Sequence, residues 1–309
     1  MYRFFRKFIF TILLPFYFTL SMAVISPAYL IRFISIKITN KLSETWMYYT
    51  LIILRLVAIK KIRLHYNPAI LSYKKSLLIS NHVNYFDWLV IWASLIILKK
   101  KNITFNVKKS LSKIYYIFGR TKMLNFVFLR RKLDYDYITI VDACNKLKKL
   151  EEYTDIIFPE GTLFTHKKSK QVNLKRCKER CINPPLTHVM PPKTMGFEIM
   201  MSQLKKDLDG IINCTLRYDN ASKFKIKNLI LGKANRITVD IYLDEATIDH
   251  NTECEKWLLD LYIEKDKLFK KENGFFNSKL KTIDIETPKI YKLFLKFGFS
   301  NCISTRKNK

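Results

Sequence analysis

The sequence has little glycine, few acidic residues and no closely paired cysteines. Only 7 of its 309 residues are glycine. No G-x-S-x-G segment occurs, so the sequence lacks the nucleophile elbow of serine hydrolases. None of the six cysteines forms a C-x-x-C pair, and Cys177 and Cys181 have no second pair at a spacing that zinc requires. We therefore expect no metal site, and reduced thiols in a protein that faces the cytosol.

Acidic residues are outnumbered by basic ones. The chain has 55 lysines and arginines against 26 aspartates and glutamates, a formal net charge of +29. Such an excess favours an anionic partner: a nucleic acid, an acidic membrane face or a phosphorylated substrate. A biased base composition, rich in lysine and isoleucine codons, is an equally good explanation of the excess as a whole. The chain carries no DNA- or RNA-binding motif, which argues against the first partner.

The N-terminal region contains a long uncharged segment. Residues 8–31 include no charged side chain, and a helix of about 24 residues can cross a hydrocarbon core of roughly 30 Å. Pro15 and Pro27 either kink this helix or divide it into a hairpin. A cleaved signal peptide would have a shorter apolar region, of about 7–15 residues. Basic residues flank both ends, which fits a hairpin with both ends on the cytosolic side. A second apolar run, 46–59, predicts an interfacial or core helix.

The remaining chain alternates short apolar runs with longer helical patterns. This order predicts an α/β fold, with a mixed central sheet flanked by helices and an N-terminal membrane-anchoring helix or helical hairpin. The expected strands are 62–65, 76–80, 102–107, 126–129, 155–158, 186–190, 210–218 and 237–243, and the expected helices are 88–98, 108–118, 137–150, one from about 198, and 254–271. We divide the chain into an anchor with interfacial helices (1–59), the α/β domain (60–276) and a basic amphipathic tail (277–309).

Two of the expected strands run directly into reactive side chains. The strand 76–80 leads to His82 and Asp87, and the strand 155–158 leads to Glu160, Gly161 and Thr162. In open α/β sheets, sites form outside the carboxyl ends of strands. We therefore expect both groups at one edge of the sheet.

His82 and Asp87 are candidates for a general base and its partner. Five residues apart, they would point about 140° away from each other in a regular helix. They can meet if His82 precedes the helix and Asp87 lies in its first turn, with Asn81 or Asn84 supporting the junction. Asp87 would then fix the imidazole tautomer, and the other ring nitrogen could take a proton from a hydroxyl. A capping aspartate beside a hydrogen-bonded histidine explains the same residues without catalysis.

The second group predicts an anion site. Gly161 allows backbone N–H groups to approach an anion, and Thr162 can cap a following helix. Arg131 can add a guanidinium fork, and Lys193 with Thr194 can widen the site. Taken singly, Arg131 is equally well a solvated charge, and Lys193 with Thr194 a loop before a helix.

Together these segments form four blocks in a fixed order. The blocks are Asn81-His82-x-x-x-x-Asp87, Phe128-Leu129-Arg130-Arg131, Phe158-Pro159-Glu160-Gly161-Thr162 and Met190-Pro191-Pro192-Lys193-Thr194. This order resembles the glycerolipid and lysophospholipid acyltransferases. It is most similar to the branch that holds the lysocardiolipin and lysophosphatidylinositol acyltransferases and some 1-acylglycerol-3-phosphate acyltransferases.

The resemblance implies an acyl-CoA-dependent O-acyltransferase with no bound cofactor, in which acyl-CoA is a co-substrate. It implies that His82 is the general base and Asp87 its orienting partner. It also implies that Arg131, Glu160, Gly161 and Thr162 hold the glycerol phosphate of a lysophospholipid acceptor, while Lys193 and Thr194 shape the acyl or CoA region. The expected location is the endoplasmic reticulum membrane, with the site facing the cytosol. A non-catalytic lipid-binding protein on the same fold is the alternative.

Two positions depart from the pattern of that family. The third block often continues with arginine, where this chain has Leu163. The second block usually has a proline before its glycine, where this chain has 116–120, Tyr-Ile-Phe-Gly-Arg. Both departures concern the choice of head group more than the catalytic step.

Overall fold

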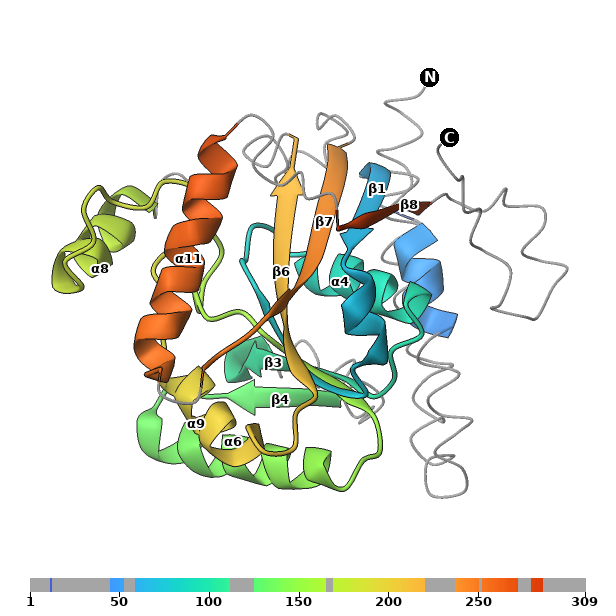
Figure 1. Cartoon of the computed structure of the whole chain (residues 1–309), viewed down its shortest axis with the longest axis horizontal. Helices are drawn as coiled ribbons and strands as arrows, with labels where there is room; N and C mark the ends of the chain where they lie inside the picture. The colour runs from blue at the N-terminus through green and yellow to red at the C-terminus, as the bar shows by residue number, and fades with distance from the viewer. Residues whose placement is uncertain are drawn as a thin grey trace, which may run out of the picture.

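One mixed sheet organises the part of the chain that the computed structural model describes, which is residues 12, 45–52, 59–111, 125–164, 169–219, 237–249, 252–271 and 279–285. Its strands are β1 (Ile59–Tyr66), β2 (Lys75–Ser80), β3 (Ile103–Lys108), β4 (Asn125–Leu129), β5 (Tyr153–Ile157), β6 (Gly210–Tyr218), β7 (Ile237–Ala246) and β8 (Lys281–Ile285). The α-helices of the described residues are a helix at 45–52, α4 (Asp87–Ile97), α6 (Leu133–Lys148), α8 (Leu174–Glu179), α9 (Met195–Leu204) and α11 (Cys254–Lys270). The predicted α/β class with a mixed sheet is confirmed (Figure 1).

The strand order places the reactive segments side by side. The sheet runs β4-β3-β5-β2-β6-β7-β1-β8. The five strands from β4 to β6 are mutually parallel, so their carboxyl ends share one edge. β7 is antiparallel to β6, and β1 is parallel to β7. The segments after β2, β4 and β5, which carry the predicted site residues, therefore begin at the same edge of the sheet.

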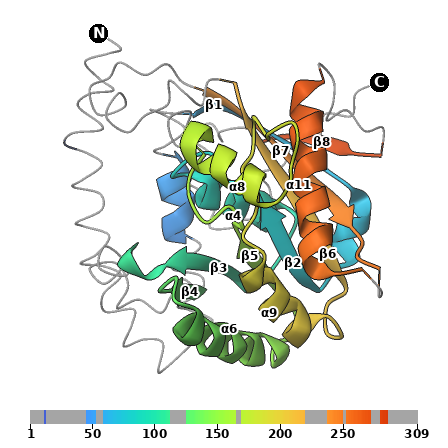
Figure 2. The same cartoon turned by 90° about the vertical axis from the view of Figure 1, so that its left-hand side faces the viewer.

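Both faces of the sheet are buried. Neighbouring residues of one strand enter different cores: Leu78 packs with α4 and the 45–52 helix, whereas Leu77 and Ile79 pack with α6, α9 and α11. This division follows from the two-residue side-chain period of a strand. Figure 2 shows α11 on one side of the strands and the 45–52 helix on the other. A strand covered on both faces has to be apolar throughout, which is why β2 could be recognised from its continuous run.

Residues 186–190, which the sequence predicted as a strand, contain no strand. The backbone N–H groups of Thr187, His188 and Val189 donate to a single carboxylate oxygen of Asp266, at 2.8, 2.6 and 3.3 Å. Pro191 and Pro192 follow and have no N–H to offer a neighbouring strand. The segment is therefore an apolar loop whose donors are bonded by α11, and its apolar composition reflects burial alone.

Other boundaries also differ from the expected ones. Lys108 ends β3 and residues 109–111 form a 3-10 turn, while 112–124, where the rest of the predicted 108–118 helix falls, lie outside the described residues. Residues 281–285, which the sequence division placed in the tail, form β8 and pair antiparallel with β1.

The predicted membrane segment 8–31 lies outside the described residues, apart from Ile12. The predicted 46–59 helix is described as a helix at 45–52, and Ile59 already belongs to β1. Within the described ranges, no helix has both the length and the apolar character needed to cross a membrane.

Candidate active site

His82 and Asp87 are in contact at the end of β2. His82 lies in the irregular segment between β2 and α4, and Asp87 is the first residue of α4. The Nδ1 atom of His82 is 2.9 Å from Oδ2 of Asp87. The Asp87 side chain is completely buried, whereas 24% of the His82 side chain is exposed. The predicted geometry, with the histidine just before the helix, is confirmed, and it leaves one edge of the ring open.

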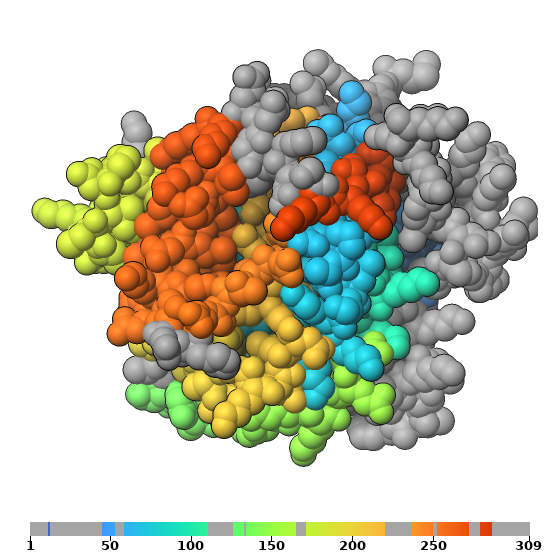
Figure 3. Space-filling model, viewed as in Figure 1, coloured from blue at the N-terminus to red at the C-terminus, as the bar shows by residue number. Residues whose placement is uncertain are grey.

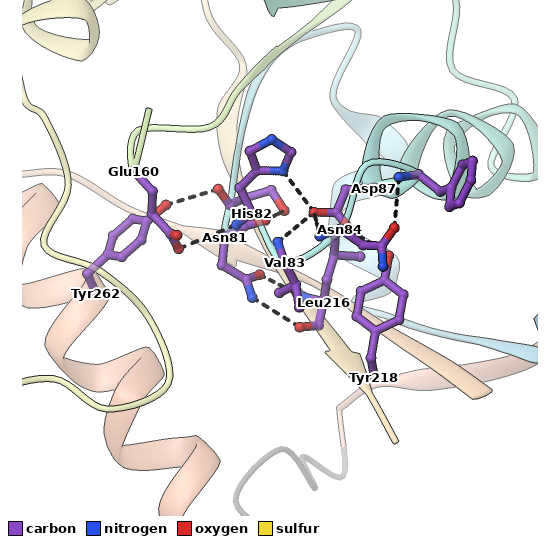
Figure 4. Close-up of polar contacts among 11 residues, drawn as sticks. Asn81, His82, Val83, Asn84, Asp87, Glu160, Leu216, Tyr218 and Tyr262 are labelled. Carbon is purple, nitrogen blue, oxygen red and sulfur yellow. Dashed lines mark hydrogen bonds and ion pairs between the residues drawn. The ribbon is translucent and has the colours of Figure 1, made fainter. Parts of the chain in front are cut away.

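Asp87 is held by donors from several directions. Its Oδ2 atom also accepts the backbone N–H groups of Val83 and Asn84, at 2.7 and 2.9 Å. Its Oδ1 atom accepts the hydroxyl of Tyr218, at 2.5 Å (Figure 4). Burial raises the pKa of Tyr218 well above its usual value, so the phenol remains a donor. A carboxylate fixed in this way holds the proton of His82 on Nδ1 and leaves Nε2 as an acceptor.

Two asparagines stabilise the segment around the histidine. Asn81 donates from Nδ2 to the carbonyl of Leu216 at 3.0 Å and accepts the Leu216 N–H at 2.8 Å. It therefore extends the pairing of β2 with β6 beyond the last residue of the strand. Asn84 accepts the N–H of Phe86 at 3.2 Å. The predicted supporting role is thus divided: Asn84 braces the turn into α4, and Asn81 binds β6.

The ring of His82 is also positioned from the β5 side. It packs on Phe158, with ring centroids 4.5 Å apart and planes inclined by 32°. The carbonyl of His82 accepts the N–H of Phe164 at 2.7 Å. The segment that follows β5 therefore holds both the side chain and the backbone of His82.

Glu160 lies behind His82, away from the surface. Its side chain is fully buried, and Oε1 accepts the backbone N–H of His82 at 3.4 Å. Tyr262 of α11 bonds the carbonyl of Ser80 at 2.9 Å on the same side (Figure 4). Burial raises the pKa of Glu160 and lowers the pKa of Lys265 to about 8, while the attraction between the two opposes both shifts. The Glu160 carboxyl thus lies buried behind the backbone of His82, and its predicted contact with the acceptor stays a prediction.

The turn after Glu160 brings the other predicted residues together. Gly161 adopts φ +66°, a conformation that favours glycine. Its carbonyl accepts the guanidinium of Arg131 from the segment after β4. The N–H of Lys193 bonds the carbonyl of Pro159 at 2.8 Å, and a Cβ on Gly161 would lie 3.4 Å from the Lys193 side chain. Arg131, Gly161 and Lys193 thus come from three segments and meet at one place.

The two predicted threonines have different surroundings. Thr162 is half-buried, and Leu163 and Phe164 after it are not helical. The prediction that Thr162 caps a helix is therefore wrong, because no helix begins at Leu163 or Phe164. Thr194 is buried and precedes α9, where its carbonyl accepts the N–H of Glu198 at 2.9 Å and its hydroxyl makes no cap bond.

Arg176 of α8 contacts the same turn, and no sequence pattern distinguishes it from the other basic residues of its segment. Its Nη1 atom donates to the carbonyls of Glu160 and Pro191, at 3.1 and 3.2 Å. Burial lowers the pKa of Arg176, Glu160 opposes this shift, and Arg180 and Arg131 lower the pKa further. Burial, Arg176 and Arg131 together lower the pKa of Lys193. We call Gly161 with Arg131, Arg176 and Lys193 the cationic turn.

Two buried groups near the pair, the hydroxyl of Ser80 and the thiol of Cys214, are not free to act as nucleophiles. Ser80 is fully buried and donates to the carbonyl of Asn81 at 2.9 Å. Cys214, the residue of β6 that pairs with Ser80, is fully buried, and burial raises the pKa of its thiol to about 11. Among the described residues, no group of three or more His, Cys, Asp or Glu side chains is placed to hold a metal ion.

Residues 61–214, from β1 to the middle of β6, match the family described as Acyltransferase. The chain belongs to the acyltransferase family of the glycerolipid enzymes. It is 29% identical over 164 residues to human 1-acyl-sn-glycerol-3-phosphate acyltransferase delta, a match that covers 52% of this chain and 42% of that protein. It is 26% identical over 207 residues to a probable 1-acyl-sn-glycerol-3-phosphate acyltransferase 5 of Arabidopsis thaliana, covering 65% and 54% of the two chains. The chain thus spans about half the length of these relatives.

The fold agrees with that of a solved structure described as a 1-acyl-sn-glycerophosphate acyltransferase, PlsC, from Thermotoga maritima. The superposition covers 85% of this chain and 95% of that one, with a TM-score of 0.50 and 16% sequence identity. The acyltransferase segment includes β2, β4 and β5, and so contains His82, Asp87 and the cationic turn. The 116–120 segment, which departs from the family pattern, lies outside the described residues.

Proposed function

We propose that this chain transfers an acyl group from acyl-CoA to the hydroxyl of a lysophospholipid, with 1-acylglycerol 3-phosphate as the first candidate acceptor. The observation that supports this proposal most strongly is the contact of a partly exposed His82 with a buried Asp87, next to the cationic turn. A base and an anion site at one strand edge suit an acceptor that carries both a hydroxyl and a phosphate.

In the proposed reaction, the acceptor's own hydroxyl is the nucleophile. Nε2 of His82 takes the hydroxyl proton while the oxygen attacks the thioester carbonyl. An ester C–O bond forms, the C–S bond breaks, and the proton passes from His82 to the departing sulfur of CoA. Asp87 keeps the ring in the required tautomer and stabilises the imidazolium. The burial of Ser80 and Cys214 supports a direct transfer without a covalent intermediate on the protein.

The phosphate of the acceptor is proposed to bind at the cationic turn. Arg131 and Lys193 are exposed there, and Gly161 turns the backbone at a positive φ. Thr162 and Thr194 flank this turn. Glu160 supports it from below, because its carboxyl is buried and bonds the backbone of His82.

Membrane attachment is part of the proposal, because both the acceptor and the product are lipids. The uncharged segment 8–31 and its basic flanks support it. We propose the endoplasmic reticulum, with the site on the cytosolic face. Fractionation and protease protection of a tagged full-length chain test this, and a protected site or a purely soluble protein contradicts it.

The test of the activity is an assay of the purified full-length protein in detergent or liposomes. Radiolabelled acyl-CoA of several chain lengths is combined with lysophosphatidic acid, lysophosphatidylinositol, lysocardiolipin and lysophosphatidylcholine. We expect a diacyl product with at least one anionic acceptor and release of one free CoA thiol per ester formed. Binding of the lysophospholipids with no product for any pair would favour the lipid-binding alternative.

A further inference from the structure

Arg176 reaches the acceptor-binding region from an element that carries none of the four sequence blocks. It lies on α8, which projects beside α11 at the left of Figures 1 and 3. Its Nη1 bonds join the turn after β5 to the segment that carries Lys193, through the carbonyls of Glu160 and Pro191. The side chain is half-buried. Its guanidinium is therefore fixed at the junction of two segments that also support the cationic turn.

Some N–H donors of the Arg176 guanidinium are not used by its two bonds to carbonyls. An arginine side chain carries five N–H donors. Both bonds to carbonyls use Nη1, and across the described ranges neither Nε nor Nη2 makes a hydrogen bond. Ligation of an anion by the remaining fork therefore would not require Arg176 to leave its anchor points.

Among the described residues, Glu160 and Glu179 lie near Arg176, but neither forms an ion pair with it. None of Arg131, Arg176 and Lys193 forms an ion pair with an acidic side chain in the described part of the chain. The nearby Glu160 carboxyl is buried, and burial raises its pKa, which disfavours its charged form. Burial lowers the pKa of Arg176 and of Lys193, and repulsion from neighbouring cations lowers both further. An anion bound among them would relieve this repulsion.

The residue that follows Thr162 in the turn is uncharged. Leu163 follows Thr162 and is half-exposed. The turn itself therefore contributes backbone but no positive side chain, and each of the three cations comes from another segment. Residues 160–163 carry no guanidinium of their own, and Arg176 supplies one from α8.

We infer that Arg176 is an acceptor-binding residue, which contacts the phosphate together with Arg131 and Lys193 and selects a phosphomonoester over a phosphodiester. The inference rests on the proposed function of this site. A phosphomonoester carries a charge of about −1.5 to −2 at neutral pH and three oxygens free to accept hydrogen bonds. A phosphodiester carries one charge and has two such oxygens. Three cations around one turn complement the former better.

The test compares Arg176→Gln and Arg176→Lys with the wild-type full-length enzyme. Arg180→Gln is the matched control, because Arg180 follows α8 directly and its Nη2 atom forms an ion pair with Glu255 at 3.5 Å instead of bonding the turn. The kinetic constants are measured with lysophosphatidic acid as the phosphomonoester, with lysophosphatidylinositol as the phosphodiester, and with varied acyl-CoA.

For Arg176→Gln we expect the KM for lysophosphatidic acid to rise about tenfold to a hundredfold, as loss of hydrogen bonds to a charged group requires. The KM for acyl-CoA should stay within about twofold, kcat should change less than KM, and the preference for lysophosphatidic acid should fall. Arg176→Lys should be intermediate, because it keeps the charge but cannot bind two oxygens in parallel.

The inference is overturned if Arg176→Gln keeps the wild-type KM for lysophosphatidic acid, or if kcat falls equally for both acceptors, as loss of a purely structural anchor would produce. Should Arg176→Gln fail to fold by circular dichroism, Arg176→Lys decides: an unchanged KM and preference overturn the inference, and a severalfold rise specific to lysophosphatidic acid supports it. A wild-type enzyme inactive with every acceptor refutes the proposed function instead, before any variant is compared.

Discussion

The His82–Asp87 pair and the cationic turn lie at the same edge of the sheet, but their charges are paired very differently. Asp87 accepts hydrogen bonds from His82, Tyr218 and two backbone N–H groups and is wholly buried. In the cationic turn, burial lowers the pKa of both Arg176 and Lys193, and neighbouring cations lower both further. The pair is complete in the protein alone, whereas the turn would be completed electrostatically by the phosphate that we propose it binds.

This contrast indicates that the pair and the turn have different tasks, proton transfer and substrate binding. Groups that act on a reacting proton gain from being fixed in advance, because no reorganisation is then needed in the transition state. Groups that bind a charged substrate gain when the substrate itself supplies the missing charge. Changes in the pair should therefore act mainly on kcat, and changes in the turn mainly on the KM of the acceptor.

Asp87→Asn should have the largest effect of the variants that leave His82 in place. An asparagine amide can donate to Nδ1, which would move the histidine proton to Nε2 and remove the acceptor that the substrate hydroxyl needs. We expect kcat to fall about 10²- to 10⁴-fold, with little change in the KM of either substrate. Steady-state acyl transfer measures both constants. A kcat within threefold of the wild type would show that Asp87 only stabilises the segment before α4.

Lys193→Met should act on binding instead. The methionine keeps a flexible chain of similar length against Gly161, where the lysine stem lies 3.4 Å from a Cβ position, and removes only the charge. We expect the KM for lysophosphatidic acid to rise about tenfold, with kcat reduced less than threefold. The wild-type KM should rise with ionic strength, and the variant should respond less. An equal salt response in both proteins would place Lys193 outside the binding site.

Tyr218→Phe tests how far the pair depends on its more distant support. The variant removes the donor to Oδ1 of Asp87 and leaves the ring in place. Removal of one donor from a buried polar group lowers stability by about 1–3 kcal/mol. We expect that loss in urea unfolding, and a kcat reduced about threefold to tenfold, with the KM values retained. Unchanged stability together with unchanged kcat would show that the Tyr218 bond adds nothing to the positioning of Asp87.

Asp155→Asn is the matched control, because it removes a buried carboxyl from the same region without touching the pair. Asp155 lies on β5 and accepts a hydrogen bond from Asn106 at 2.9 Å. Burial raises the pKa of Asp155 from 3.8 to about 7. The folded state therefore holds a proton that the unfolded state has already lost, and stability falls as the pH rises from about 4 to about 7.

Asparagine removes this titration. Asp155→Asn should therefore be more stable than the wild type at pH 8, with a smaller gain at pH 5, and should keep wild-type kcat. Urea midpoints at the two pH values and the acyl-transfer assay check this. An equal difference in stability at both pH values would contradict the assigned titration, and a loss of kcat would show that buried carboxyls in this region act on catalysis in general.

The sequence predicted the pair more completely than it predicted what surrounds the pair. His82, Asp87 and the glycine turn follow short apolar runs, and a parallel sheet brings such strand ends to one edge. The glycine at position 161 was also informative, because the turn after β5 has a positive φ there that most other residues avoid. The burial of Glu160 could not be predicted, because it depends on how α11 packs behind β2.

Tyr218 and Arg176 could not be identified from local patterns. Tyr218 is 131 residues from Asp87, and their contact depends on β6 being the neighbour of β2. Arg176 is one of several basic residues in its segment, and only the packing of α8 against two carbonyls distinguishes it. The incorrect strand at 186–190 has the same origin: its backbone donors are bonded by Asp266, a side chain 77 to 79 residues away.

The most direct test of the central claim is the rate of acyl transfer from labelled acyl-CoA to lysophosphatidic acid by His82→Ala, with Asp155→Asn assayed in parallel. If His82 is the general base, the variant should lose about 10²- to 10⁴-fold in kcat while its fold and liposome binding are retained. A folded His82→Ala protein that transfers acyl groups within a few fold of the wild-type rate would contradict the account.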